Sequence, residues 1–331
     1  MTKSNQANNL EVSVYKVCVN CTTYNQSSYI TDALNGFVMQ QTRFPFIAVV
    51  VDDASTDGEQ KVIRSYVNDH FDHSLDSGFK EWETDDAYWT FARHKENVNC
   101  HFVVAYLKKN LYKQQEKKKT VIREWMNSKY IALCEGDDYW IDPLKLQKQV
   151  DFLEAHEDYA LCFTNSIVKK HDKDVKAINA IWDTYSIEDI ISTNALNMTQ
   201  RGDNVVSCGH TSTLLYRVPE KPLAAWVSKC YIGDEPLFIA LGQYGKAKFL
   251  NEEMSVYREG VGVSSNNFSF EKDWRNRIKM YQIINKGLNN KYSKIITPII
   301  RKYKLKVFKL LWKSARKREA IGFVINALKQ Q

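Results

Sequence analysis

Three clusters of polar side chains each follow a short apolar run in this sequence of 331 residues. They occupy residues 22–25, 52–57 and 135–138 and contain hydroxyl, amide and carboxyl groups. Open α/β sheets bind their ligands at the carboxyl ends of parallel strands. A single Asp-rich strand end is often only a turn or a helix cap. Three such ends in succession are costly unless a cation or hydrogen-bond donors lie among them, so we expect a ligand site there.

The apolar runs before these clusters have the character of strands. Residues 46–51 read Phe-Ile-Ala-Val-Val-Val, which is typical of a strand covered on both faces. Further strands are expected at 12–22 and 130–134, and apolar residues recur at helical spacing over 29–38 and 62–66. Strand, helix, strand and helix within about 55 residues predict an α/β fold with a mostly parallel sheet flanked by helices.

The later part of the sequence predicts the remaining elements. Residues 68–100 mix aromatic and charged side chains without a clear period, and we predict an insertion or long loop there. Asp142 followed by Pro143 predicts a helix start, with Asp142 as the N-cap. Strands are expected at 159–164 and 211–216.

The order and spacing of these segments resemble those of family 2 glycosyltransferases, which have the GT-A fold. The resemblance lies in VCVNCTTYN at 17–25, VVVDDASTDG at 49–58 and EGDDYW at 135–140. It implies a GT-A glycosyltransferase domain at 12–265, preceded by a polar tail at 1–11 and followed by a helical, basic region at 266–331.

The resemblance also implies a site for a nucleotide-sugar donor. Thr22 and Tyr24 would line the base pocket, and Asp53 would accept a hydrogen bond from the uracil imide N–H. Asp137 would lie near the ribose or the diphosphate. Asp138 would bind Mg²⁺ or Mn²⁺, a cation that stabilises the departing nucleoside diphosphate.

On the acceptor side, Asp234 would be the general base that removes the proton of a sugar hydroxyl. It could also serve as the N-cap of a helix at 235–241. Relatives often have Asp at the position of Glu135. Glu135 itself either acts near the metal or is only a solvated residue at the end of a strand. Many relatives have a His shortly after the segment matching 255–258, but EGVGVSS at 259–265 has none, so the third metal ligand stays unassigned. His210 is either an acceptor contact or a structural residue, of which we favour the second.

These roles imply inverting transfer of a sugar from a UDP-sugar to a glycan or lipid-linked glycan acceptor, in bacterial surface polysaccharide biosynthesis. One alternative is a sugar-phosphate nucleotidyltransferase, although residues 22–29 contain no Gly, Lys or Arg for a phosphate-binding loop. The other is a catalytically inactive sugar-nucleotide-binding protein, which requires Asp138 or Asp234 to be misplaced.

Charge is distributed unevenly along the chain. Residues 271–331 contain 17 Lys and Arg against 3 Asp and Glu, whereas the rest is acidic. An apolar stripe between Pro298 and Trp312 is flanked by lysines, which suits either a helix lying on an anionic membrane or a helix docked on the catalytic domain. The acidic body argues against nucleic-acid binding.

Location and redox state follow from the absence of export signals. The N-terminus is polar, and no segment approaches the roughly 18 apolar residues that span a bilayer. We expect a cytoplasmic protein, either free or peripheral on the inner face of the membrane. Its seven cysteines would then be reduced. Cys18 and Cys21 form the only CxxC, at a spacing that places them on opposite faces of a strand.

Overall fold

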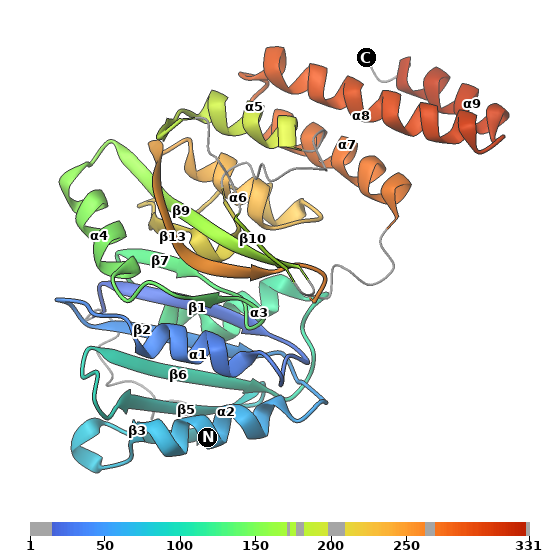
Figure 1. Cartoon of the computed structure of the whole chain (residues 1–331). Helices are drawn as coiled ribbons and strands as arrows, with labels where there is room; N and C mark the ends of the chain where they lie inside the picture. Colours follow the sequence, from blue (N-terminus) through green and yellow to red (C-terminus); the bar gives the residue numbers. More distant parts are fainter. Residues whose placement is uncertain (1–14, 171–172, 177–181, 198–208, 262–268, 329–331) are drawn as a thin grey trace, which may run out of the picture.

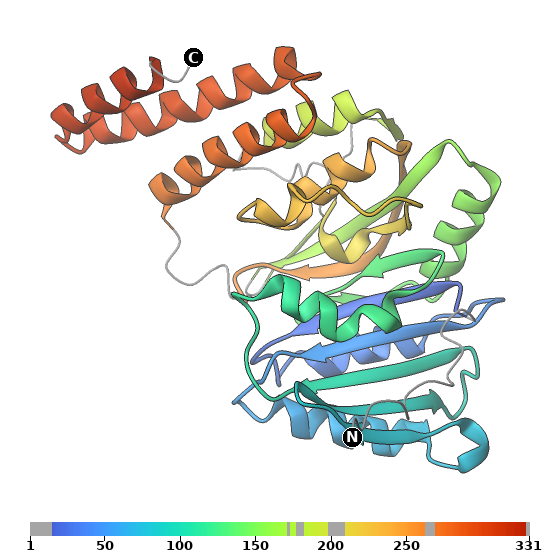
Figure 2. The same cartoon turned by 180° about the vertical axis from the view of Figure 1, so that it is seen from behind.

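The computed structural model describes residues 15–170, 173–176, 182–197, 209–261 and 269–328. A large sheet forms the centre of the molecule, and helices α7, α8 and α9 pack at one end (Figure 1). Helices α1 and α2 cover one face of the sheet, while α3 covers the other (Figure 2). The predicted class is confirmed: an α/β protein with a mostly parallel sheet flanked by helices and a helical C-terminal region.

The centre of the sheet is parallel, with the strand order β7-β1-β2-β6. These strands are β1 (Val17–Thr23), β2 (Phe46–Asp52), β6 (Cys100–Leu107) and β7 (Tyr130–Leu133). Every residue of β2 is buried, as its continuous apolar run predicts. The helices that follow are α1 (Ile30–Val38), α2 (Glu59–His70), α3 (Gln115–Ile122) and α4 (Lys145–Ala155).

Mostly antiparallel pairing extends the sheet on both sides of this centre. On one side β5 pairs with β6 and carries β3 and β4; on the other, β12 joins β7 to β9, and β9 pairs in parallel with β13. The bounds are β3 (Phe71–Asp72), β4 (Lys80–Glu83), β5 (Ala87–His94), β8 (Tyr139–Trp140), β9 (Tyr159–Lys170), β10 (Lys173–Lys176), β11 (Thr184–Tyr185), β12 (Leu215–Arg217) and β13 (Lys246–Arg258).

The predicted insertion or long loop at 68–100 is wrong, because β3, β4 and β5 lie there. The indole rings of Trp82 and Trp89 stack across β4 and β5, with centroids 5.6 Å apart. Trp89 is buried whereas its neighbour Tyr88 is exposed. The alternation of a strand is thus present, but charged residues on the solvent side of these outer strands obscure it.

Three other predicted boundaries need correction. Helix α4 begins at Lys145, and Leu144 rather than Asp142 is its N-cap; the Asp142 carboxylate instead accepts the Leu144 N–H at 2.7 Å, which stabilises the preceding turn. The strand expected at 211–216 begins with a 3-10 turn and contributes only β12. The strand expected from residue 12 begins at Val17, and residues 12–14 lie outside the described part.

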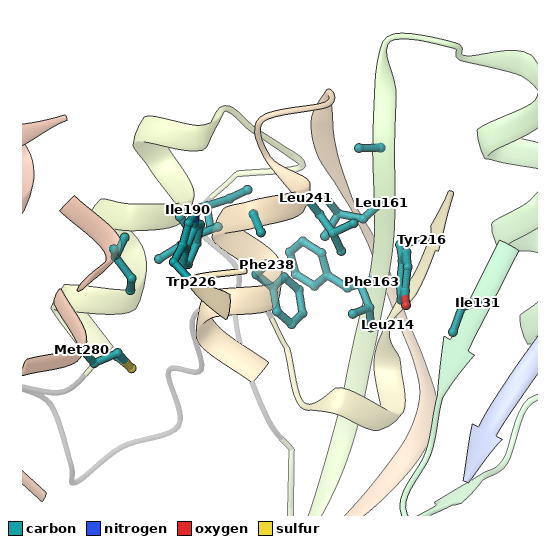
Figure 3. Packing of buried hydrophobic residues seen from close by; sticks show 14 of the residues in the cluster. Ile131, Leu161, Phe163, Ile190, Leu214, Tyr216, Trp226, Phe238, Leu241 and Met280 are labelled. Carbon is teal, nitrogen blue, oxygen red and sulfur yellow. The ribbon is translucent and has the colours of Figure 1, made fainter. Parts of the chain in front are cut away.

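The C-terminal helices share a hydrophobic core with the region beside the sheet. They are α7 (Phe270–Gly287), α8 (Ser293–Lys313) and α9 (Lys317–Leu328), and they lie near α5 (Ile187–Asn197) and α6 (Asp234–Leu241). Figure 3 shows Met280 of α7, Ile190 of α5 and Phe238 of α6 in one cluster, which continues to Phe163 of β9.

The apolar stripe of α8 is buried within that cluster. Ile299, Tyr303, Val307 and Leu311 lie on one side of the helix and are at most 6% exposed. The docked-helix interpretation of this stripe is therefore confirmed. No helix in the described ranges is long and apolar enough to cross a membrane.

The cysteines fit the expected reduced state in the part of the chain that the structure describes. Six of them are free thiols, and all but Cys230 are buried. Cys208 lies outside the described residues.

Candidate active site

The three polar clusters meet at the carboxyl edge of the central strands, as predicted. The N–H of Asp53 donates to the carbonyl of Thr23 at 2.9 Å, and the N–H of Gly136 donates to the carbonyl of Thr22 at 3.2 Å. These bonds continue the pairing of β1 with β2 and β7 beyond the strand ends. The segments at 22–25, 52–57 and 135–138 are therefore direct neighbours.

Gly136 lets the acidic turn approach β1 closely. A Cβ at this position would lie 2.3 Å from the hydroxyl oxygen of Thr23 and 2.7 Å from Oε1 of Gln26. Real Cβ atoms do not come this close to other atoms, so only glycine fits without moving the turn.

Glu59 joins the loops that follow β1 and β2. Its Oε1 accepts the hydroxyl of Thr23, and its Oε2 accepts the N–H of Gln26 at 3.0 Å and the hydroxyl of Ser55 at 2.7 Å. Burial raises the pKa of Glu59, and these hydrogen bonds oppose that effect. Sequence analysis did not single out this residue, because an acidic residue in a first helical turn is common for other reasons.

Asp53 belongs to a buried ion pair. Its Oδ2 accepts a hydrogen bond from Lys118 Nζ at 2.7 Å, and its Oδ1 accepts the N–H of Leu111 at 2.6 Å. The side chains of Asp53 and Lys118 are 2% and 8% exposed. A buried carboxylate needs such partners. Lys118 is one of three consecutive lysines on α3, and no sequence signal distinguishes it from Lys117 and Lys119.

The acidic turn crowds three carboxyl groups together. Burial raises the pKa of Asp138 well above its ordinary value, and the charges of Glu135 and Asp137 add to this shift. Burial also raises the pKa of Glu135 to about 7, although its Oε2 accepts the hydroxyl of Thr211 at 2.7 Å. Ionisation of all three groups would therefore concentrate negative charge that a cation would offset.

Arg258, at the end of β13, holds the acidic turn from its other side. Its backbone N–H donates to Oδ1 of Asp138 at 3.0 Å, and its guanidinium donates to the Asp137 carbonyl at 2.7 Å. The guanidinium also pairs with Asp32 of α1 and lies 4.5 Å from the ring centroid of Tyr139. Most of the Gly- and Ser-containing segment that follows, from residue 262 to 268, lies outside the described residues.

Asp234 is an exposed residue at the beginning of α6. The helix starts at Asp234 itself and Gly233 is the N-cap, so the predicted capping role is wrong. Its Oδ1 instead accepts the N–H of Glu235 at 2.8 Å. After burial and Asp137, the charge of Asp234 contributes to the raised pKa of Glu135.

His210 packs against the ring of Tyr257. The two rings stack with centroids 3.8 Å apart, and burial lowers the pKa of His210 to about 4. Its Nε2 has no hydrogen-bond partner within the described part of the chain. An uncharged, stacked ring is what a structural role predicts.

Among the described residues, no group of three or more His, Cys, Asp or Glu could hold a metal ion without other ligands. Mg²⁺, however, is commonly bound through one or two carboxylates together with water and substrate phosphates. Asp137 and Asp138 fit a site of that kind, because burial and the neighbouring carboxyl groups raise the pKa of Asp138, and a bound cation would favour its ionised form.

Known proteins resemble this chain in two ways: some share sequence with part of it, and others share its fold. No family model matches the chain. Uncharacterized proteins of Mycobacterium bovis and Mycobacterium tuberculosis are 35% identical over 141 residues, which are 43% of this chain and 32% of theirs. The chain therefore spans about a third of the length of these curated relatives.

Among solved structures, Staphylococcus aureus TarS residues 1–349 in complex with UDP-GlcNAc has a TM-score of 0.51 at 16% identity, covering 82% of this chain and 66% of that one. The mannosyltransferase PcManGT from Pyrobaculum calidifontis, in complex with GDP-Man and Mn²⁺, has a TM-score of 0.46 at 11% identity, covering 95% and 86%. The likeness to TarS shows a shared fold.

Glu135→Gln is expected to stabilise the metal-free protein at pH 8.5 and to leave it unchanged at pH 4. The pKa of Glu135 rises from 4.5 to about 7 on folding, so its contribution to stability is complete below pH 4.5 and is lost as the pH rises through 7. Glutamine removes this loss and still accepts the Thr211 hydroxyl. At pH 8.5 the free energy of unfolding should increase by about 1–3 kcal/mol, as measured by urea unfolding in EDTA.

The control is the exposed Glu220→Gln, which should have no effect at either pH. An equal effect of Glu135→Gln at both pH values would contradict the assignment of a raised pKa.

Proposed function

We propose that the chain is a metal-dependent, inverting glycosyltransferase that moves a sugar from a UDP-sugar to an acceptor hydroxyl. The observation that carries this proposal is the meeting of Asp53 and the acidic turn at 135–138 at one sheet edge, together with an exposed carboxylate, Asp234, at the start of α6. A nucleotide sugar needs a base pocket, a cation for its diphosphate and a base for the acceptor, and these residues have the matching chemistry. The fold shared with TarS supports the same function.

The base of the donor would lie against Thr22, Tyr24 and Asp53. Each carboxylate oxygen of Asp53 accepts one hydrogen bond and has a further lone pair. That lone pair suits the imide N–H of uracil, and the neighbouring Lys118 ammonium suits a uracil carbonyl. The ion pair therefore offers an acceptor beside a donor, which matches the edge of this base.

The diphosphate would be bound at the acidic turn. In this proposal Asp138 binds Mg²⁺ or Mn²⁺, and Asp137 lies beside the ribose or the diphosphate. When bound, the cation supplies positive charge that stabilises the leaving diphosphate. Arg258 fixes the orientation of the turn through its bonds to Asp138 and to the Asp137 carbonyl.

Asp234 would remove the proton of the acceptor hydroxyl. One of its oxygens accepts the Glu235 N–H, and no described residue contacts the other through a hydrogen bond or ion pair. The side chain is exposed, so an acceptor can reach it. Attack from this side, opposite the leaving diphosphate, inverts the anomeric centre.

The loop after β1 disfavours the alternative of a sugar-phosphate nucleotidyltransferase. Such an enzyme needs free backbone N–H groups to bind phosphates. Here the N–H groups of Asn25, Gln26 and Ser27 already donate to Ser55, Glu59 and Asp57.

The second alternative, a catalytically inactive sugar-nucleotide-binding protein, predicts donor binding without release of UDP. Turnover assays therefore separate it from a transferase.

The acceptor in this proposal is a glycan or lipid-linked glycan used in bacterial surface polysaccharide biosynthesis, by analogy with the family that the motifs resemble. A lipid-linked acceptor would bring the enzyme to the inner face of the cell membrane. The face of α8 opposite the buried stripe suits such contact. Leu305 and Trp312 are 50% and 46% exposed there, two turns apart, among the exposed Lys302, Lys309 and Lys313.

Asp138→Asn should remove the dependence of UDP binding on Mn²⁺, because the amide is a poor ligand for the cation. The amide oxygen can still accept the Arg258 N–H, so we expect the fold to persist. Calorimetric titration of UDP with and without Mn²⁺ measures the effect. The exposed Asp76→Asn is the control, and unchanged metal-dependent binding in Asp138→Asn would show that the cation lies elsewhere.

Asp234→Asn should slow turnover by roughly 10²–10⁴, the range for loss of acid–base assistance. The assay is release of UDP from the UDP-sugar that raises the melting temperature most in a screen of nucleotide sugars. UDP affinity should stay unchanged. A purely structural Asp234 predicts near-parent turnover, because the Asn oxygen also accepts the Glu235 N–H.

Replacing both Leu305 and Trp312 by Glu should reduce sedimentation with phosphatidylglycerol vesicles and leave the melting temperature unchanged. Phosphatidylcholine vesicles should bind neither protein, since anionic lipid attracts the lysines. The matched control replaces Leu75 and Val98, also exposed, by Glu. Equal vesicle binding by the parent and the α8 variant would contradict the membrane contact.

A further inference from the structure

A cluster of charged side chains is buried between α6 and α7, next to Asp234. Oε2 of Glu235 pairs with the Arg277 guanidinium at 2.8 Å, and Oε1 accepts the hydroxyl of Tyr281. The same guanidinium pairs with Asp273 at 3.2 Å. The Glu235 and Arg277 side chains are each 10% exposed, and Tyr281 is fully buried.

Such a cluster is an inefficient way to gain stability. Burial raises the pKa of Glu235, and Arg277 opposes that shift. Burial by itself lowers the pKa of Arg277, but Glu235 and its other partners raise that pKa above its ordinary value. A buried ion pair is often no more stabilising than apolar residues of similar size. Its better-supported use is to select one arrangement of the elements that it joins.

The segment fixed by this cluster contains Asp234. On one side of it, Glu235 is bound to α7 through Arg277. On the other, the hydroxyl of Tyr231 donates to Asp273 at 2.6 Å. Between these two anchors Gly233 is loosely surrounded, since an added Cβ would meet no atom within 4 Å. The direction of the Asp234 side chain therefore depends on the two contacts with α7.

We propose that Arg277 is a positioning residue for acceptor activation: through Glu235 and Asp273 it holds residues 231–235, and with them Asp234, in one arrangement. This inference rests on the proposed function, in which Asp234 is the base. If Arg277 has this role, α7 is necessary for activation of the acceptor. Donor binding, at the ends of β1, β2 and β7, does not depend on α7.

Arg277→Lys tests the proposal with little risk to the fold, because it keeps the positive charge and loses the planar fork that reaches two carboxylates. The matched control is Arg275→Lys on the same helix, whose guanidinium pairs with Glu271 and Glu319 away from α6. A second variant, Glu235→Gln combined with Arg277→Gln, replaces the ion pair by two amides.

Three measurements are made where circular dichroism shows each variant to be folded. Arg277→Lys should lower kcat for UDP release roughly 10- to 100-fold, as expected for a misplaced catalytic group. Its UDP affinity should remain within about twofold of the parent. Hydrogen exchange of the amides at 232–235 should accelerate, while exchange in β1 stays unchanged. Arg275→Lys should alter none of the three, and the double variant should behave like Arg277→Lys.

The opposite results overturn the proposal. Parent kcat together with parent amide exchange in Arg277→Lys would show that the cluster does not position Asp234. Equal losses in Arg277→Lys and Arg275→Lys would assign the effect to the stability of α7. If the parent releases UDP from no nucleotide sugar, the proposed function fails. Amide exchange at 232–235 then still tests the anchoring by Arg277, because it needs no turnover.

Discussion

The arrangement of this protein depends on the burial of carboxylates, two at one edge of its sheet and one between α6 and α7. Asp53, Asp138 and Glu235 are largely withdrawn from water, and a buried carboxylate is tolerated only with hydrogen-bond donors or a cation beside it. Each receives its donors from a different element: α3, β13 and α7. The packing of α3 and β13 thus supplies donors to the sheet edge, and the packing of α7 supplies them to Glu235.

The donors come from distant parts of the chain. Lys118 is 65 residues from Asp53, and the Arg258 N–H is 120 residues from Asp138. A buried ion pair such as Asp53–Lys118 adds little net stability, and a buried carboxylate such as Asp138 is costly without its donor, so arrangements that leave either unpaired are heavily penalised. These contacts thus favour a single register of α3 and β13 against the sheet. The same selection places the Asp53–Lys118 ion pair on one side of β1 and the acidic turn on the other.

Sequence analysis predicted the parallel centre of the sheet because completely buried strands have continuous apolar runs, as in β2. It did not predict β3 to β5, whose exposed charges interrupt a short alternation. The meeting of the three polar clusters was predictable, since parallel strands end at one edge. The cationic partners of Asp53 and Glu235 were not, because Lys118 and Arg277 differ from neighbouring basic residues only in tertiary contacts. Periodicity likewise showed that α8 has an apolar stripe, but not what covers it.

The absence of a side chain at Gly136 has a consequence for the size of the molecule that can bind. With the acidic turn in contact with Thr23, the distance from the Asp53 ion pair to the turn is determined by backbone packing. Exchange of surrounding side chains alters what each end recognises but not the separation of the two ends. Under the proposed function, the site therefore selects its donor by length. The base and the diphosphate of that donor would have to span this fixed separation.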